Sequence, residues 1–275
     1  MAAIRFLLVA LALLCMGFSP TMLYQRWGAA GCLQGEETAT GDTIFMCNWS
    51  DDTGGGTREQ DCDEADNYDW DDEQGTSAEQ DGASAICAGA DSIEINAILE
   101  WVGNGGGMGG GDLNENVFYQ RTYFKVTAHG ALGNGDFNRI MGYRNSASGI
   151  RGYLQVYRTA ATTELRCRFP DEDGNNWTDC GPDAEHVLNY ANCYWGEIYF
   201  NVTTEWTGWR VYEQVNCAGA YTQVIGAGGA FDQADSNLTM SQIDEEFLGQ
   251  ERGSDAFTFE VSHYHSSRAA IGAAW

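Results

Sequence analysis

The feature that most constrains the fold of this chain is a series of short strand-like segments, separated by glycine-rich turns, that runs through its second half. The segments are rich in β-branched and aromatic residues, as expected for strands that are half buried in a sheet. No convincing helical pattern appears after residue 113. Such strands at near-regular spacing predict a β-sandwich or jelly roll. The expected strands cover residues 117–126, 139–143, 152–158, 163–169, 195–203, 209–215, 257–261 and 269–273.

Two stretches precede the expected sandwich, which we place at residues 113–275. Residues 103–112 contain seven glycines in ten positions and predict a flexible loop or linker. Residues 19–102 are acidic and cysteine-bearing, and we expect them to be part of the sandwich or an arm attached to it. Within them, residues 93–102 fit either a strand or a short helix. The acidic run 61–73 predicts a solvated loop, with loose calcium binding as the alternative, because it lacks EF-hand spacing.

Residues 1–18 predict a secretory leader. Arg5 supplies a short basic region, and residues 6–18 form an apolar stretch that is shorter than the roughly 20 apolar residues of a membrane-spanning helix. No clean cleavage site follows, so cleavage and retention as an anchor both stay open. The expected location is extracellular, either secreted or at the cell surface.

Cysteine usage agrees with export. One of the nine cysteines, Cys15, lies in the leader, and the even number that remains predicts disulfides in an oxidising compartment. The cysteine-free span 88–166 divides them into two blocks, so we expect pairing within each block. A metal site is the weaker alternative, because the sequence has no CxxC pair. The first block is Cys32, Cys47, Cys62 and Cys87, and the second is Cys167, Cys180, Cys193 and Cys217.

The charge of the chain excludes one class of partner. Fourteen basic residues face 40 acidic ones, which gives a net charge of −26. Nucleic acids and anionic membranes are bound by neutralising their charge with cations, so this surface would repel both. Neutral glycans, divalent cations or a salty medium remain compatible with it.

Four segments together resemble a concanavalin A-like or laminin-G-like β-sandwich. They share the order of aromatic, basic and glycine residues seen along the strands of such proteins, and the resemblance covers about residues 117–275. It implies a jelly-roll fold that ends in a closing strand. The segments are 118–126 (FYQRTYFKV), 195–202 (WGEIYFNV), 208–212 (GWRVY) and 270–274 (AIGAA).

Residues 242–249 (QIDEEFLG) resemble the catalytic strand of laminarinase- or lichenase-type β-glucanases, in which Glu-x-Asp-x-Glu places three carboxylates on one face. Because strand side chains alternate, Gln242, Asp244 and Glu246 would share a face. Gln242 stands where the family has its nucleophile, and an amide cannot form the glycosyl-enzyme ester. Glu245 would point to the opposite, apolar face. The resemblance therefore implies sugar binding by Asp244 and Glu246; in an enzyme these two would be the catalytic residues.

A candidate calcium site lies in residues 171–179. Carboxylates at alternate positions, together with a side-chain amide, provide the oxygen ligands that a hard cation prefers. A turn at residues 173–175 that needs no metal is the alternative. Calcium is the cofactor that the sequence suggests. The expected ligands are Asp171, Asp173, Asn175 and Asp179.

Aromatic residues concentrate between residues 177 and 221, where exposed rings would stack on a sugar. Loop positions favour exposure of Trp177 and Trp206, whereas Trp195 and Tyr199 are expected to pack inside. The expected sugar-binding residues are Trp177, Trp206, Asn175, Asp244 and Glu246. N-glycosylation sequons begin at Asn48, Asn176, Asn201 and Asn237.

Together these features predict an exported, disulfide-linked β-sandwich that binds a glycan or cell-surface polysaccharide without cleaving it. In this hypothesis calcium shapes the binding loop. The main alternative is a structural subunit of an extracellular filament or sheath, which would self-assemble with the acidic first part as a contact arm. A glycoside hydrolase of the β-glucanase type comes third.

Overall fold

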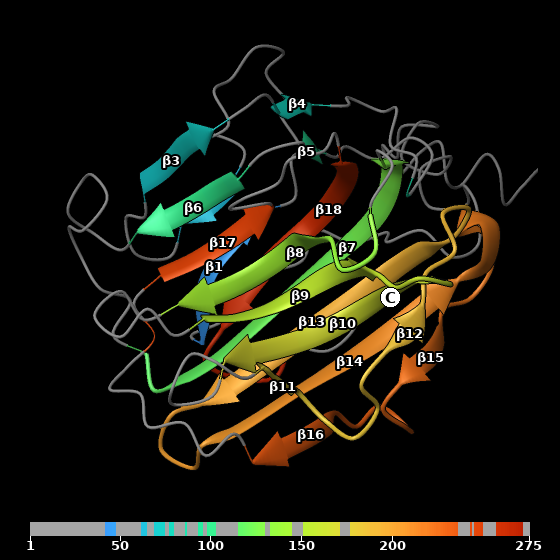
Figure 1. Ribbon diagram of the computed structural model, residues 1–275. Helices are drawn as coiled ribbons and strands as arrows, with labels where there is room; N and C mark the ends of the chain where they lie inside the picture. Colours follow the sequence, from blue (N-terminus) through green and yellow to red (C-terminus); the bar gives the residue numbers. More distant parts are fainter. Residues whose placement is uncertain are drawn as a thin grey trace, which may run out of the picture.

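The structure is a computed structural model of the 275-residue chain. It describes residues 42–47, 62–64, 69–74, 77–79, 86, 93–95, 98–102, 115–129, 133–144, 151–170, 177–235, 243, 245–249 and 257–271. In these ranges the regular elements are β-strands, apart from one 3-10 turn at Val215–Cys217, and they form two antiparallel sheets (Figure 1). None of the described residues belongs to a helix long and apolar enough to cross a membrane.

The larger sheet, sheet A, has ten strands within the described part of the chain. Its main path runs β15 (Thr222–Ile225), β14 (Trp206–Gln214), β13 (Cys193–Asn201), β7 (Val117–His129), β18 (Phe257–Ser267), β1 (Thr43–Cys47) and β2 (Cys62–Glu64). Three short strands pair outside this path. They are β16 (Asp232–Asp235) on β14, β5 (Ile93–Ile95) on β18, and β4 (Ser77–Glu79) on β5.

The second sheet, sheet B, has eight strands in the described ranges. Its path runs β11 (Trp177–Asp179), β10 (Thr163–Pro170), β9 (Arg151–Arg158), β8 (Phe137–Arg144), β17 (Glu245–Gly249), β6 (Ile98–Val102) and β3 (Asp69–Gln74), with β12 (His186–Val187) on β10. Figure 1 shows these strands in front of sheet A. The predicted jelly-roll β-sandwich is therefore confirmed.

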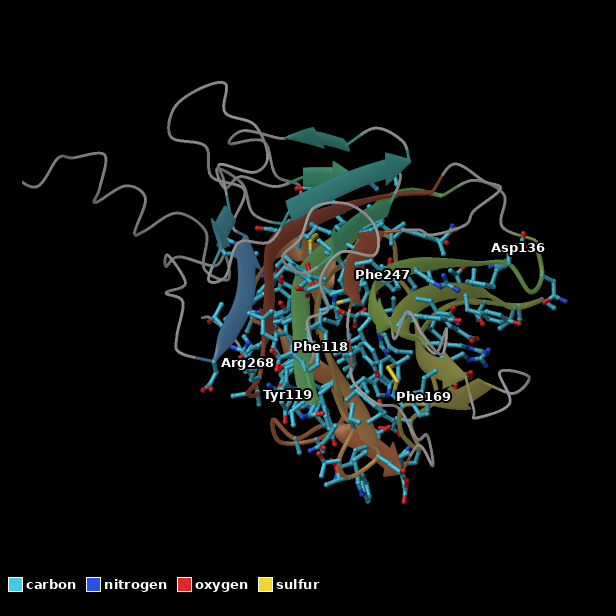
Figure 2. All side chains as sticks on the ribbon, turned by 90° about the vertical axis from the view of Figure 1, so that its left-hand side faces the viewer. Phe118, Tyr119, Asp136, Phe169, Phe247 and Arg268 are labelled. Atoms are coloured by element: carbon cyan, nitrogen blue, oxygen red, sulfur yellow. A yellow bond between two sulfur atoms is a disulfide. The ribbon has the colours of Figure 1, made fainter. Side chains whose placement is uncertain are left out.

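The hydrophobic core lies between the two sheets. Strand β7 illustrates how alternating side chains build this core. Phe118 and Phe124 point into the core, while Tyr119, the next residue after Phe118, lies on the opposite face. Figure 2 views the sandwich from the side, with Phe118 between the sheets. Within the core, the rings of Phe124 and Tyr194 stack at a centroid distance of 5.5 Å. Such aromatic pairs contribute about 0.5–1.5 kcal/mol beyond the area that they bury.

The acidic segment before the glycine-rich loop contributes strands to both sheets. Strand β1 pairs with β18 in sheet A, and β6 pairs with β17 in sheet B. The loop predicted for 61–73 is wrong for 62–64 and 69–73, which belong to strands β2 and β3. Residues 93–102 form the two strands β5 and β6 and no helix in their described part. Pairing with neighbouring strands overrides the weak strand preference of acidic residues.

The last predicted strand, residues 269–273, is wrong in its described part. Residues Ala269–Ile271 lie outside any strand. The chain turns directly after β18, where the Arg268 N–H donates to the Asp42 carbonyl at 2.8 Å. The Ala269 N–H then donates to the Ser267 hydroxyl at 3.1 Å. These bonds end the strand, so the closing strand implied by residues 270–274 does not begin here.

Two disulfides confirm pairing within the second cysteine block. Cys167 bonds to Cys180, and Cys193 bonds to Cys217. The first links β10 to the residue after β11, and the second links the start of β13 to the 3-10 turn. In the first block, the described backbone places Cys47 opposite Cys62 in the β1–β2 pair. Cys32 and Cys87 lie outside the described residues.

Candidate functional site

The carboxylate of Glu246, expected to bind sugar, lies inside the sandwich and is fully buried. The Tyr264 hydroxyl donates to its Oε2 at 2.5 Å, and the Ser266 hydroxyl donates to its Oε1 at 3.0 Å. Burial raises the pKa of Glu246 to about 7, although both hydroxyl hydrogen bonds act to lower it. Ile243 also packs in the core between the sheets, so strict alternation does not hold from 243 to 246. Gln242 and Asp244 lie outside the described residues.

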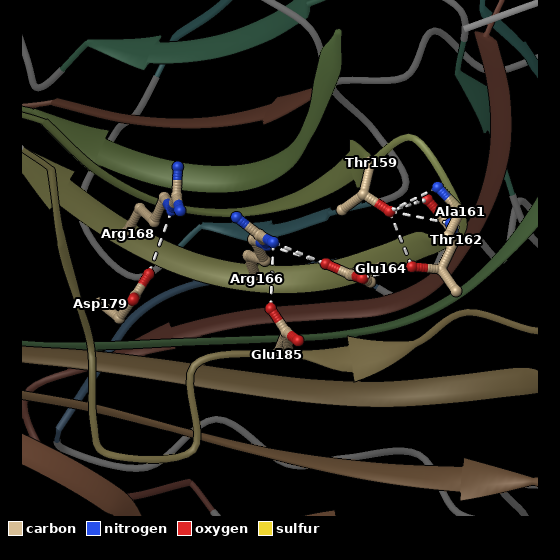
Figure 3. A network of polar contacts seen from close by, with 8 residues as sticks. All are labelled: Thr159, Ala161, Thr162, Glu164, Arg166, Arg168, Asp179 and Glu185. Carbon is tan, nitrogen blue, oxygen red and sulfur yellow. Dashed lines mark hydrogen bonds and ion pairs between the residues drawn. The ribbon is translucent and has the colours of Figure 1, made fainter. Parts of the chain in front are cut away.

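The candidate calcium loop is described only at its end. Asp171, Asp173 and Asn175 lie outside the described residues, while Asp179 accepts a hydrogen bond from Arg168 Nε at 3.1 Å (Figure 3). Within the described part, no group of three or more His, Cys, Asp or Glu side chains is arranged to hold a metal ion. The calcium site therefore stays a prediction.

The remaining predicted site residues are described in part. Trp206 is 38% exposed at the start of β14, as expected, whereas only the backbone of Trp177 is described, at the start of β11. Asn201 ends β13, and its Oδ1 accepts the N–H groups of Thr203 and Thr204. Asn48, Asn176 and Asn237 lie outside the described residues, and glycosylation stays a prediction for all four sequons.

Four side chains form a charged row on the outer face of sheet A, the face turned away from sheet B. Alternation sends every second side chain to this face, and the register of four neighbouring strands aligns them. All four are buried, and Glu197 is fully enclosed. The charged row consists of Arg210 of β14, Glu197 of β13, Arg121 of β7 and His265 of β18.

The two carboxylate oxygens of Glu197 have different partners. Its Oε2 accepts bonds from Arg210 Nε at 3.0 Å and Nη2 at 2.5 Å. Its Oε1 accepts the backbone N–H of Ile271, which follows β18, at 2.9 Å. An unpaired buried carboxylate costs several kcal/mol, so this arginine holds the carboxylate in place on the outer face.

Beside the charged row lies a group of aromatic rings that we call the aromatic platform: Tyr119, Tyr199, Phe231 and Trp206. The rings of Tyr119 and Tyr199 stack at 5.2 Å with an interplanar angle of 22°. Phe231 meets Tyr199 edge-on at 4.8 Å. Trp206 lies two residues before Gly208, the register partner of Tyr199, and so points to the same face one row away.

Three contacts fix the platform. A Cβ added at Gly208 would lie 2.4 Å from Tyr199 Cε1, so glycine is needed there for the ring to lie over β14. The Tyr199 hydroxyl donates to Gln233 Oε1 at 2.7 Å. Arg210 Cζ lies 4.3 Å from the Phe231 ring centroid, which joins the platform to the charged row. Burial, followed by the charge of neighbouring Tyr119, raises the pKa of Tyr199 to about 12, so its hydroxyl stays protonated.

A second aromatic group lies across the charged row from the platform. Trp195 meets Tyr212 edge-on at 4.5 Å and lies 6.3 Å from Tyr123, and Ile86 packs against this group. Trp195 and Tyr199 are buried as predicted, but they lie on the outer face of sheet A and not between the sheets. The sequence holds a signal for this face, since Trp195, Glu197 and Tyr199 alternate along one strand.

The outer face of sheet B carries a different polar network (Figure 3). Arg166 Nη2 contacts Glu164 at 2.7 Å and Glu185 at 3.0 Å, and Arg168 contacts Asp179. Arg166 Cζ also lies 4.2 Å from the Tyr157 ring centroid. Each of the two arginines is paired with a carboxylate. We therefore infer that this network stabilises sheet B.

Comparisons with known proteins leave the function open. No family model matches the sequence, and no curated protein matches it. One similar solved structure is that titled "Cellulose induced protein, Cip1", with a TM-score of 0.44 and 10% identity over 83% of this chain and 99% of that chain. A carbohydrate esterase from Shiga toxin-encoding bacteriophage phi24B has a TM-score of 0.45 and 13% identity over 82% and 97% of the two chains. A Lotus tetragonolobus seed lectin has a TM-score of 0.36 and 8% identity over 71% and 94%. Similarities this distant carry no argument about function.

Proposed function

We propose that the protein binds a glycan on the outer face of sheet A, with the aromatic platform as the surface on which a sugar ring stacks. The observation that carries this proposal is the group of packed rings, Tyr119, Tyr199 and Phe231, beside an exposed tryptophan on the same face. Tyr119 and Phe231 are partly exposed, so a ligand reaches them without unfolding the sheet.

The chemistry of the platform suits a sugar. The apolar C–H face of a pyranose packs on aromatic rings, and its hydroxyl groups need fixed polar partners nearby. Tyr199 supplies such a partner, because its hydroxyl donates to Gln233 while the oxygen keeps a lone pair for an incoming donor. The net charge of −26 favours a neutral glycan over an acidic one.

Binding without cleavage is the activity that we propose. A retaining glycosidase needs two carboxyl groups roughly 5–5.5 Å apart on the bound sugar. The charged row contributes one carboxylate, Glu197, which Arg210 holds, and Glu246 is enclosed between the sheets. These positions support a binding protein better than a β-glucanase.

A glycan array followed by calorimetry with the best ligand tests this function. Trp206→Ala and Tyr119→Ala are each expected to weaken binding roughly tenfold through lost stacking. Phe137→Ala is the matched control, because Phe137 is an equally exposed aromatic residue (37%) on β8 of sheet B. Binding to no glycan, or an equal loss in the control, would refute the proposal.

A further inference from the structure

We propose that Glu197 is the polar floor of the glycan site, and that the Ile271 N–H occupies the place of a sugar hydroxyl on it. The inference rests on the proposed function and adds a segment of the chain that covers part of the glycan site. Residues Arg268–Ile271, which we call the strap, follow β18 and end with the Ile271 N–H on Glu197. In this proposal residues 270–271 move away before a ligand hydroxyl binds Glu197.

The carboxylate of Glu197 is preorganised to accept a hydrogen bond. Arg210 grips Oε2 through two nitrogens, which fixes the orientation of the whole carboxylate. The other oxygen, Oε1, then faces the strap and accepts the Ile271 N–H at 2.9 Å. Charge-assisted bonds of this kind are also those that a carboxylate makes to sugar hydroxyl groups. The backbone N–H is thus a chemical surrogate for a ligand donor.

The polar floor and the aromatic platform adjoin each other. Arg210, the partner of Glu197, lies over the Phe231 ring. After burial, the charge of Glu197 is the next cause that raises the pKa of the platform residue Tyr119, which is consistent with their proximity. Ser267, the residue before the strap, is the register partner of Tyr119. A ligand stacked on the platform would therefore meet both Glu197 and the strap.

The strap is anchored at its base, and beyond the base the Ile271 N–H bond to Glu197 holds its described end. The Arg268 N–H and the Ser267 hydroxyl both donate to the Asp42 carbonyl, at 2.8 Å and 3.0 Å. The Arg268 guanidinium also holds the base, because its Nε and Nη2 donate to Glu115 Oε1 at 2.9 Å and 2.6 Å. Ala269 and Ala270 are exposed. Displacement of residues 270–271 would therefore leave the base in place and free Glu197 Oε1 for a ligand hydroxyl.

Proline at position 271 gives a sharp test, because it removes the N–H that bonds to Glu197. We expect Ile271→Pro to bind the array-selected glycan roughly tenfold more tightly, since the internal competitor is lost. Ile271→Ala is the matched control that keeps the N–H, and it is expected to bind like the parent. If Ile271→Pro unfolds, as circular dichroism would reveal, Arg268→Ala combined with Glu115→Gln loosens the strap and is expected to tighten binding instead.

Hydrogen–deuterium exchange of the peptide containing residues 268–271 provides a second readout. The inference predicts faster exchange in the strap when glycan is bound. Glycan binding with unchanged or slower exchange, together with an Ile271→Pro affinity no tighter than that of the parent, would overturn the strap and leave the glycan site intact. If neither the parent nor Ile271→Pro binds any glycan, the proposed function and this inference both fail.

Discussion

The Glu246 carboxylate and the Tyr264 hydroxyl form a 2.5 Å hydrogen bond that joins β17 of sheet B to β18 of sheet A inside the sandwich. Gln120 of β7 adds to this bridge, since its Nε2 donates to the Gly142 and Phe247 carbonyls of sheet B, each at 3.1 Å. A strand whose sequence resembles a catalytic one thus contributes a buried polar link between the sheets.

The buried position of Glu246 predicts a pH dependence of stability. Its pKa of about 7 in the folded chain lies above its ordinary value of 4.5, so the folded state binds the proton more tightly than the unfolded state. The contribution of this group is therefore fully present below pH 4.5 and falls as the pH rises towards 7, by about 3 kcal/mol in total. Urea unfolding of the parent and Glu246→Gln between pH 4 and 8 isolates the contribution of Glu246, because both proteins contain all the other carboxylates. Equal pH slopes in the two proteins would contradict the assignment.

The Glu197–Arg210 pair predicts a large asymmetry between single and double substitutions. Arg210→Ala leaves a fully buried carboxylate without its arginine, at a cost of about 3–5 kcal/mol in the free energy of unfolding. Replacing both residues with leucine removes both charges and is expected to cost less than the single change. Chemical denaturation measures both values. A single variant as stable as the parent would show that the pair contributes nothing to holding the outer face.

Alanine substitutions at two glycines of sheet A are expected to affect glycan binding and stability differently. Gly208→Ala drives a Cβ into the Tyr199 ring at 2.4 Å on the outer face, so we expect lower stability, by about 1–3 kcal/mol, and weaker glycan binding. Gly196→Ala is the control on the inner face, where the Cβ would meet Leu154 at 2.8 Å, and it is expected to lower stability alone. Thermal unfolding and calorimetry distinguish the two. If Gly208→Ala and Gly196→Ala lost the same amount of glycan affinity, Tyr199 would not be part of the glycan site.

The register of β1 and β2 predicts a third disulfide. Cys47 and Cys62 are directly opposite each other in this antiparallel pair, and such residues have Cα atoms about 4.5–5.5 Å apart, within the range that a disulfide spans. We therefore expect a Cys47–Cys62 bond, which leaves Cys32 to pair with Cys87. Peptide mapping under non-reducing conditions identifies the bonds. A peptide that joins Cys47 to Cys87 would contradict this pairing.

The sequence predicted the strands whose own side chains alternate strongly. Strands β7, β9 and β10 lie close to their expected bounds, because aromatic and branched residues mark both faces of each strand. Strands β2 and β3 were missed because acidic residues give a weak strand signal, and only pairing with a neighbour makes them strands. The error at residues 269–273 is the opposite one, because a strand was expected there although alanine and glycine carry little strand preference.

The candidate site was harder to predict from the sequence than the strands were. Exposure of Trp206, the first residue of β14, was predicted from its expected loop position, but the contact between Glu197 and Arg210 depends on the register of two strands. A shift of one residue would send either side chain to the other face, and local sequence does not fix that register. For the same reason alternation alone did not reveal that Glu246 faces the interior.

The most direct test of the glycan site is a crystal structure of the protein with the glycan that binds it most tightly on an array. The account predicts a sugar ring within about 4 Å of Tyr119 and Trp206 on the outer face of sheet A. It also predicts a sugar hydroxyl on Glu197 Oε1, where the Ile271 N–H now lies. A glycan bound on the outer face of sheet B, with the aromatic platform bare, would contradict it.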